Sequence, residues 1–189
     1  MTVVRALLDR SDVRAAGRIH SVHDARRIAK HRLPPVVFDY IEGAADDEIT
    51  VRRNESAFTS VTFRPKMAVG PFEPVLSRTL LGWHLDLPVI LAPCGLVRLF
   101  HVDGPAGVAR AAASRGTVSV LSTVSGSSLE EVHDAAGVPI WFQLYAAGGL
   151  GEAATLCRRA EDAGVEVLVV TVDTPALGNR ERDVGHGVA

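Results

Sequence analysis

The sequence predicts an α/β fold in which about half of a (β/α)8 barrel follows an N-terminal helical segment, and three observations lead to this prediction. Short apolar runs, rich in branched residues, each end in polar residues or a Pro–Gly turn. Helical patterns separate these runs at a spacing of about 25 residues, which is typical of a parallel sheet with helical crossovers. No Gly-x-Gly-x-x-Gly follows the first run, so a barrel is favoured over a doubly wound nucleotide-binding sheet.

The composition is that of an ordinary globular protein. The chain has 189 residues, 47% of them hydrophobic, and a net charge of −2 with both signs mixed along the sequence, so we expect no nucleic-acid partner. Cys94 and Cys157 follow no metal or disulfide spacing, which predicts no metal site and a reducing compartment. No window has the length and apolarity of a signal peptide or a membrane segment. These features predict a cytoplasmic protein.

Residues 1–74 are predicted to form a helical and irregular segment. The first helix is expected over Val22–His31, with Ser21 as its N-cap and a pair of prolines after it. A helical face follows at Val37, Tyr40, Ile41 and Ala44. A further helix should start near Asp46 and run through Asn54. Residues 59–87 contain several prolines and predict irregular structure with short strands.

Residues 75–189 are predicted to form the first half of the barrel. A whole barrel needs about 250 residues, and the part after Leu87 has room for about four strand–helix units. The strands are expected to be buried: Pro88–Ala92, Val118–Leu121, Ile140–Leu144 and Val165–Val170. The helices between them are expected over Gly104–Arg115, Ser127–Ala136 and Leu150–Ala163. Ser127 and Glu130 have the spacing of a capping box.

The last strand ends in a group of residues that predicts one wall of a ligand pocket. Thr171 and Asp173 are two apart and would point to the same side of a strand. Pro175 and Gly178 then permit a turn, and Arg180 follows it. Ligand groups of such barrels sit at the carboxyl ends of the strands. The alternative is a turn of the Asx type that only stops the strand.

Six motifs, in order and with consistent spacing, carry a resemblance to a known family. They are FDYIEGAADDE (Phe38–Glu48), RRNESAF (Arg52–Phe58), LAPCGL (Leu91–Leu96), LST (Leu121–Thr123), WFQLY (Trp141–Tyr145) and TVDTPALGNRERD (Thr171–Asp183). Together they resemble the N-terminal half of the FMN-dependent α-hydroxy-acid oxidase and dehydrogenase family, from His20 to Asp183. That family folds as a TIM barrel behind an N-terminal helical segment, in agreement with the pattern above.

The resemblance implies FMN as the cofactor, held at the carboxyl ends of the strands. Pro93, Cys94 and Gly95 would pass the flavin ring with their backbone, and Ser122, Gln143 and Thr171 would bond its polar edge and ribityl chain. A buried amide is unfavourable unless a partner bonds it, and at Gln143 this favours a ligand. The alternatives are that Ser122 caps the following helix and that Cys94 is a small packing residue.

The resemblance also implies a small 2-hydroxy acid of the lactate or glycolate kind as the substrate. Tyr40 and Arg180 would hold its carboxylate, for which the planar fork of an arginine is suited. Tyr145 would contact the substrate hydroxyl and help to stabilise developing charge. Asp173 would pair with the imidazolium of the catalytic histidine. The alternatives are a core aromatic role for Tyr40 and a solvated loop around Arg180.

The base of that family is a histidine in a His-Gly-Gly-Arg segment, which this sequence does not contain. We therefore expect the 189-residue chain by itself to turn over substrate negligibly. A second hypothesis is a non-catalytic half-barrel, because four parallel strands leave two open apolar edges. Self-association into a homo-oligomer, or pairing with another chain, would cover them. A different FMN barrel, such as an isomerase, fits less well, because Tyr40, Tyr145 and Arg180 together match the hydroxy-acid site.

Overall fold

A computed structural model describes residues 17–70, 73–146, 148–174 and 176–187, and the chain divides into two compact units. A helical unit comprises residues 1–62 and 178–189, and a sheet unit comprises residues 63–177. The division into 1–74 and 75–189 stays a prediction about where the barrel begins. Pro175, in the predicted turn after the last strand, lies outside the described residues.

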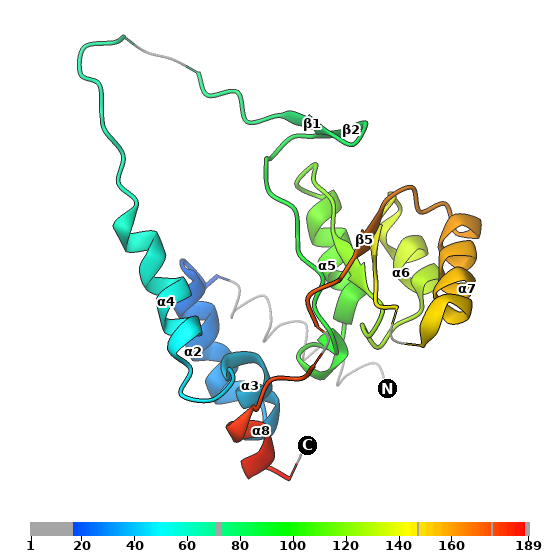
Figure 1. Cartoon of the computed structure of the whole chain (residues 1–189). Coiled ribbons are helices and arrows are strands. Elements are labelled where there is room, and N and C mark those ends of the chain that lie inside the picture. The colour runs from blue at the N-terminus through cyan, green and yellow to red at the C-terminus, as the bar shows by residue number, and fades with distance from the viewer. Residues whose placement is uncertain (1–16, 71–72, 147, 175, 188–189) are drawn as a thin grey trace, which may run out of the picture. The chain divides into compact units, whose positions relative to one another are not determined.

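The described residues of the helical unit form three consecutive helices and a short C-terminal one (Figure 1). They are α2 (Val22–Arg32), α3 (Pro35–Glu42), α4 (Ile49–Ala57), continued by the 3-10 turn η1 (Phe58–Ser60), and α8 (Glu181–Gly185). The predicted first helix is confirmed: the Ser21 hydroxyl accepts the Asp24 N–H at 3.1 Å, as an N-cap does. Pro35 opens α3, where its missing N–H is not needed.

The predicted helix from Asp46 to Asn54 is displaced by about one turn, to Ile49–Ala57. Asp46 and Glu48 have positive φ angles of 47° and 56°, so the chain passes through the left-handed region before the helix can begin. The Glu48 carboxylate also accepts the Ala44 N–H at 3.2 Å, which closes this turn.

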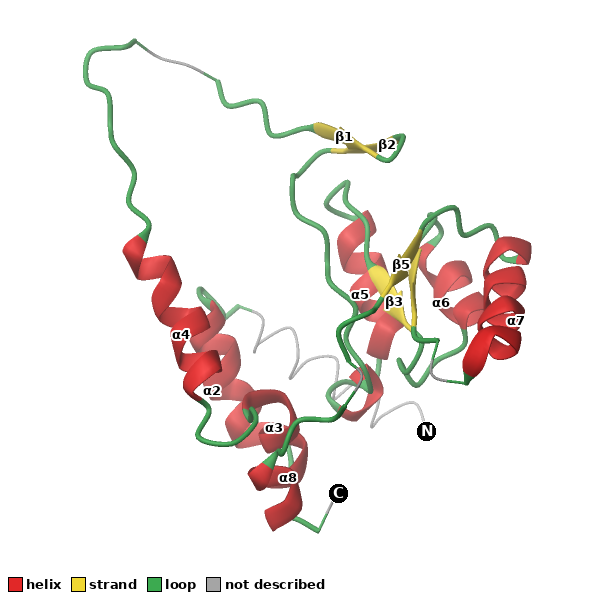
Figure 2. Cartoon of the chain, in the orientation of Figure 1, coloured by secondary structure: helices red, strands yellow, loops and turns green. Residues whose placement is uncertain are grey.

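The sheet unit holds a hairpin and a three-stranded parallel sheet (Figure 2). The hairpin pairs β1 (Arg78–Leu80) with β2 (Trp83–Leu85), and the sheet has the order β3 (Val120–Ser122), β4 (Trp141–Leu144), β5 (Leu168–Val170). Between the strands lie the 3-10 turn η2 (Val97–Leu99) and the helices α5 (Gly104–Ala113), α6 (Leu129–Ala136) and α7 (Gly149–Asp162). The predicted alternation of parallel strands and helices is confirmed.

The two faces of the sheet have different partners. Leu121, Phe142 and Leu144 point to one face and form a buried cluster with residues of α5, α6 and α7. Val120 and Trp141 point to the other face and pack with Leu85 of the hairpin. The hairpin therefore covers the amino ends of the strands, and the carboxyl ends on that face carry the polar side chains.

Two of the four strands predicted to be buried are largely exposed, so that prediction was wrong. Pro88–Ala92 is reduced to a single bridge between Leu91 and Ser119, and the Val89 side chain is 56% exposed. β5 is also open, with Val170 54% exposed. Both segments lie at edges of the sheet, and no further strand of the described residues pairs with either one. Only the central strands β3 and β4 are buried throughout.

The N-terminus of α6 is capped by Ser128 instead of the predicted Ser127. The Ser128 hydroxyl accepts the Glu131 N–H at 3.1 Å, so the capping pattern lies one residue later than predicted. Glu130 instead makes a two-fold ion pair with Arg159 of α7, with nitrogen–oxygen distances of 2.5 and 2.6 Å. This pair connects α6 to α7.

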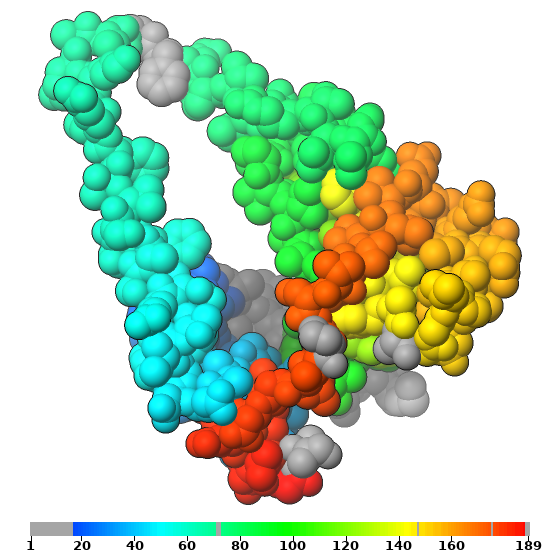
Figure 3. Space-filling model, in the orientation of Figure 1, coloured from blue at the N-terminus to red at the C-terminus, as the bar shows by residue number. Residues whose placement is uncertain are grey.

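The helix α8 belongs to the helical unit although it lies at the far end of the chain. It packs against α3, and the space-filling view shows its red atoms directly against the blue and cyan atoms of that unit (Figure 3). The residues before it contribute as well: the Asp46 N–H donates to the Asn179 carbonyl at 2.8 Å.

Candidate functional site

The structure brings Ser122, Gln143 and Thr171 together in one hydrogen-bonded row across three strand ends. The Ser122 hydroxyl donates to the Gln143 Oε1 at 3.0 Å, and the Gln143 Nε2 donates to the Thr171 hydroxyl at 2.8 Å. Ser122 lies opposite Gln143 in the β3–β4 register, and Thr171 follows β5. The alternation of a strand puts all three on the face that carries Val120, Trp141 and Val169, away from the helices.

Gln143 is 1% exposed, and its amide is bonded by the protein itself. Its Oε1 also accepts the Thr123 N–H at 3.3 Å. Ser122 does not cap α6, so that alternative is excluded. The Thr171 hydroxyl accepts from Gln143, and neither its own hydrogen nor the second amide hydrogen of Gln143 reaches an acceptor among the described residues. The row therefore presents two hydrogen-bond donors at the carboxyl ends of the strands.

Thr123 is a site residue to which the sequence analysis gave no role. Its hydroxyl donates to the Gln143 carbonyl at 2.5 Å and accepts the Tyr145 N–H at 3.2 Å. It thereby ties the end of β3 to the backbone of Tyr145, whose side chain is half-buried. The signal was the polar pair Ser122–Thr123 after an apolar run, of which only the serine received a role.

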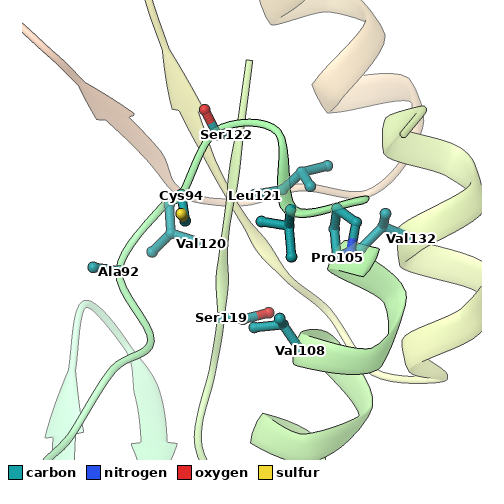
Figure 4. A pocket seen from close by; sticks show the side chains of 10 residues that line it. Ala92, Cys94, Pro105, Val108, Ser119, Val120, Leu121, Ser122 and Val132 are labelled. Atoms are coloured by element: carbon teal, nitrogen blue, oxygen red, sulfur yellow. The ribbon is translucent and has the colours of Figure 1, made fainter. Parts of the chain in front are cut away.

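The turn formed by Pro93, Cys94 and Gly95 follows the open edge of the sheet. It is held to the loop after β3, because the Leu96 N–H donates to the Val124 carbonyl at 2.9 Å. Cys94 is exposed, so a role as a packing residue is wrong. Cys94 and Ser122 line a cavity of about 30 Å³ together with apolar residues of α5 and α6 (Figure 4). This volume suits a water molecule and not a drug-sized ligand, whose pockets start at about 300 Å³.

Asp173 lies three residues beyond β5 and is exposed. Its Oδ1 accepts a weak hydrogen bond from the Thr174 hydroxyl at 3.4 Å. The predicted pairing of Asp173 with a histidine stays a prediction.

In the helical unit, the side chains of Tyr40 and Arg180 lie against each other. The Arg180 guanidinium carbon lies 5.3 Å from the centre of the Tyr40 ring, within the range of a cation–π contact. Arg180 Nη2 also donates to the Tyr40 carbonyl, and its Nε donates to Asp183 at 2.5 Å. Both side chains are half-buried, so neither a fully buried core role for Tyr40 nor a solvated loop around Arg180 describes them.

Carboxylates and cations surround this pair. Arg182 bonds Glu48 at 2.7 Å and Asp39 at 3.4 Å, and the His186 ring bonds Asp39 at 2.8 Å. The hydrogen bond from His186, followed by that from Arg182, lowers the pKa of Asp39. The backbone N–H of Ala44, followed by Arg182, lowers the pKa of Glu48. Both carboxylates are therefore ionised at neutral pH and hold α8 by charge.

Within the described residues, no group of three or more histidine, cysteine, aspartate or glutamate side chains is arranged to hold a metal ion. None of the helices in that part of the chain combines the length and apolarity that crossing a membrane requires.

Comparison with known proteins gives a consistent group of relatives. A family model described as FMN-dependent dehydrogenase matches residues 29–189. Glycolate oxidase 1 of Oryza sativa subsp. indica is 38% identical over 168 residues, and a peroxisomal (S)-2-hydroxy-acid oxidase of the same plant is 41% identical over 164. These alignments cover 89% and 87% of this chain but 46% and 45% of the relatives. The chain thus spans about half the length of the curated relatives it matches.

Solved structures agree with the sequences. A crystal structure of mandelate oxidase superposes with a TM-score of 0.84 at 37% identity, covering 89% of this chain and 49% of that one. A mandelate oxidase variant with a C4a-OH-FMN adduct gives a TM-score of 0.82 at 37% identity, covering 88% of this chain and 50% of that one. The predicted α/β barrel type of fold is confirmed by these neighbours.

Proposed function

The chain belongs to the FMN-dependent dehydrogenase family, and from this premise we propose that the protein containing it oxidises a small 2-hydroxy acid to the corresponding 2-oxo acid. The cofactor of the family is FMN. The observation that carries the proposal is the row of Ser122, Gln143 and Thr171, which offers donors at the strand ends where this family would hold its cofactor.

The donor set suits a flavin. The polar edge of a flavin ring carries carbonyl oxygens and ring nitrogens, and these accept hydrogen bonds. The hydroxyl hydrogen of Thr171 and the second amide hydrogen of Gln143 are donors that the described residues leave without an acceptor. We therefore assign Ser122, Gln143 and Thr171, with the backbone of Pro93, Cys94 and Gly95, to the cofactor. FMN, when bound, supplies the acceptor for the electrons and the hydrogen that leave the substrate carbon.

Tyr40 and Arg180 are assigned to the substrate carboxylate. Arg180 is fixed on one side by Asp183 and the Tyr40 carbonyl, so its remaining N–H groups are directed with little loss of rotamer freedom. Tyr145 is assigned to the substrate hydroxyl, with its backbone held by Thr123. Asp173 is assigned to orient the histidine that takes the hydroxyl proton. The His-Gly-Gly-Arg segment that carries this histidine in the family does not occur in this sequence.

The relatives narrow the substrate class without fixing one acid. Those above are named for glycolate, (S)-2-hydroxy acids and mandelate. We propose a small 2-hydroxy acid, with lactate as one member of that class. A cytoplasmic location remains a proposal, because one relative is named peroxisomal.

The experiment that tests the proposal is a visible spectrum of the purified chain after incubation with excess FMN and desalting. We expect a retained and shifted flavin band that Gln143→Leu abolishes, while Val138→Ala, at a half-exposed position outside the row, leaves it unchanged. A colourless wild-type chain would mean that these residues are not sufficient to hold FMN by themselves. Addition of a 2-hydroxy acid should not bleach the band of the 189-residue chain, and bleaching would contradict the expectation of negligible turnover.

A second candidate function is a non-catalytic half-barrel that pairs with a second copy of itself or with another chain. The observation that favours it is the exposure of apolar side chains at both edges of the sheet, Val89 at 56% and Val170 at 54%. An open parallel edge with apolar side chains favours strand pairing. Light scattering after gel filtration separates the candidates: a discrete homo-dimer without retained FMN favours the half-barrel, and a monomer excludes self-pairing.

A further inference from the structure

The helix α8 is fastened to the helical unit by polar contacts. It spans five residues and contributes no buried residue, and its apolar side chain Val184 is 54% exposed. A helix of this length is not stable by itself in water, because nucleation is unfavourable and few bonds follow it. Its presence therefore depends on its contacts with α3 and with the turn before α4.

Three polar side-chain contacts make that connection. Arg182 is the centre, since its Nη2 lies 2.7 Å from Glu48 Oε2 and its Nη1 lies 3.4 Å from Asp39 Oδ1. His186 reaches the other oxygen of Asp39 at 2.8 Å. Asp39 thus accepts from two residues of the α8 region, one on each oxygen.

The position of Arg180 depends on the same helix. Arg180 is the residue immediately before α8, and its Nε donates to Asp183 inside α8. Asp39 is the residue immediately before Tyr40 in α3. Arg182 comes two residues after Arg180. Its contact with Asp39 therefore joins the two segments close to the place where Arg180 lies over the Tyr40 ring.

We propose that Arg182 is a positioning residue: with Asp39 and Glu48 it holds α8 against α3, and it thereby keeps the Arg180 guanidinium over the Tyr40 ring. The proposal rests on the proposed function in one respect: that function supplies the substrate carboxylate which this arginine–tyrosine pair would bind. The pairing itself is a property of the chain and is measurable without substrate or cofactor.

The first test is hydrogen exchange followed by mass spectrometry on the peptide that contains α8. Glu48→Gln and Asp39→Asn each remove one charge that faces Arg182 and leave the sequence of α8 unchanged. Exposed ion pairs are weak, so we expect the α8 amides to exchange about twofold to fivefold faster in either variant. The matched control is Arg26→Gln, which breaks the ion pair between α2 and α3 from the α2 side and leaves the charges of Asp39, Glu42 and Glu48 in place. Exchange in α8 that responds equally to all three variants would overturn the proposal.

The second test reads the position of Arg180 directly. An aromatic ring shifts the NMR signals of groups that lie over it, so the side-chain signals of Arg180 should be displaced in the wild-type chain, and Tyr40→Leu identifies that displacement. We expect Arg182→Gln to move the Arg180 signals towards those of an exposed arginine, and Arg182→Lys to restore part of the displacement because it keeps the charge. Arg26→Gln serves as the control. If Arg180 keeps its displacement in Arg182→Gln, Arg182 has no positioning role.

The hydrogen exchange of α8 and the NMR signals of Arg180 do not depend on FMN binding or on activity in the proposed reaction, so a loss of either leaves both measurements unchanged. Conversely, an intact flavin site together with unchanged exchange of α8 in Glu48→Gln would remove this inference and leave the proposed function standing. The two failures are therefore distinguishable.

Discussion

The interactions that stabilise the sheet unit internally differ from those that stabilise the helical unit. In the sheet unit, residues of β3, β4, α5, α6 and α7 form a continuous buried apolar cluster on one face of the sheet. On the other face, the polar side chains of Ser122, Gln143 and Thr171 bond one another. In the helical unit, Phe38 is the single buried residue among residues 17–62 and 178–187. Its long-range contacts are largely polar, and they include ion pairs such as Arg26 with Glu42 and Arg182 with Glu48, together with hydrogen bonds between Asp46 and Asn179.

This difference determines how strongly the two sets of candidate site residues respond to solvent conditions. Burial of apolar surface is not weakened by charge screening, whereas an exposed ion pair is weak and is screened by salt. The residues assigned to the cofactor therefore lie on a framework that tolerates changes of solvent. The residues assigned to the substrate carboxylate lie on one that responds to them. Four predictions test this contrast.

The largest effect is expected in the core of the sheet unit. Phe142→Ala should reduce the free energy of unfolding by about 3–5 kcal/mol, because it leaves a cavity at the centre of the sheet. Chemical denaturation followed by far-UV circular dichroism measures it. The control is Phe58→Ala, at a side chain that is 83% exposed in the helical unit, for which we expect almost no change. Equal losses in the two variants would end the contrast between the units.

A smaller loss is expected from the buried polar row. Gln143→Leu leaves the hydroxyls of Ser122 and Thr171 without their shared partner, at about 1–3 kcal/mol for the unsatisfied groups. Thermal unfolding of the variant measures the loss, and Gln143→Glu, which keeps an acceptor for Ser122, is the comparison. A Leu variant as stable as the wild type would show that the row does not hold the strand ends.

The ion pair of Glu130 with Arg159 gives the sheet unit one pH-dependent contact. Arg159 lowers the pKa of Glu130 from 4.5 to about 2. Because the folded pKa is lower, the stabilisation is present above pH 4.5 and is lost as the pH falls from there towards 2. Both side chains are about half exposed, so we expect only about 0.2–1 kcal/mol.

The measurement is a series of thermal melts between neutral pH and pH 2, in which Glu130→Gln should flatten the acid branch. Glu131→Gln is the matched control, since its partner Arg98 lies 3.4 Å away at an exposed site. A Glu131→Gln curve that flattens to the same degree would contradict the assignment to Glu130.

The smallest effect is a response to salt in the helical unit. Raising the salt concentration to about 1 M shortens the screening length to about 3 Å and should speed amide exchange in α8 by about twofold. Exchange in β4, where the contacts are buried, should stay the same. Hydrogen exchange of both peptides in one sample provides its own control. A parallel change in the two peptides would mean that salt acts on global stability.

The sequence predicted the central part of the sheet unit well, because its signals are local. Apolar runs, capping residues and glycines after helices mark β3, β4, α5, α6 and α7 to within a few residues. Gly116 illustrates such a signal: its φ is +61° and a Cβ would lie 1.9 Å from the Asp86 carboxylate, so only glycine fits there. The polar groups at the strand ends were predicted because parallel strands align their carboxyl ends.

The structural features that could not be predicted depend on contacts with residues that are far away in the sequence. The apolar runs at Val89 and Val170 indicate burial, yet each segment pairs with one strand within the described part of the chain. An apolar sequence cannot reveal how many neighbouring strands it meets. The docking of α8 depends on Arg182, a residue that in sequence is one charge among several. Thr123 was missed because its role comes from the register of β3 and β4, which brings it to the Gln143 carbonyl.

The ion pair of Arg182 with Asp39 joins residues that are 143 positions apart, and this separation has a consequence for how the chain folds. Contacts of such high sequence separation form late, because the loop between them must first lose its freedom. On a ribosome, α3 is synthesised long before α8, and the whole sheet unit emerges between them. The helical unit is therefore expected to close last, after the sheet has collapsed, although α2, α3 and α4 leave the exit tunnel before the sheet unit does.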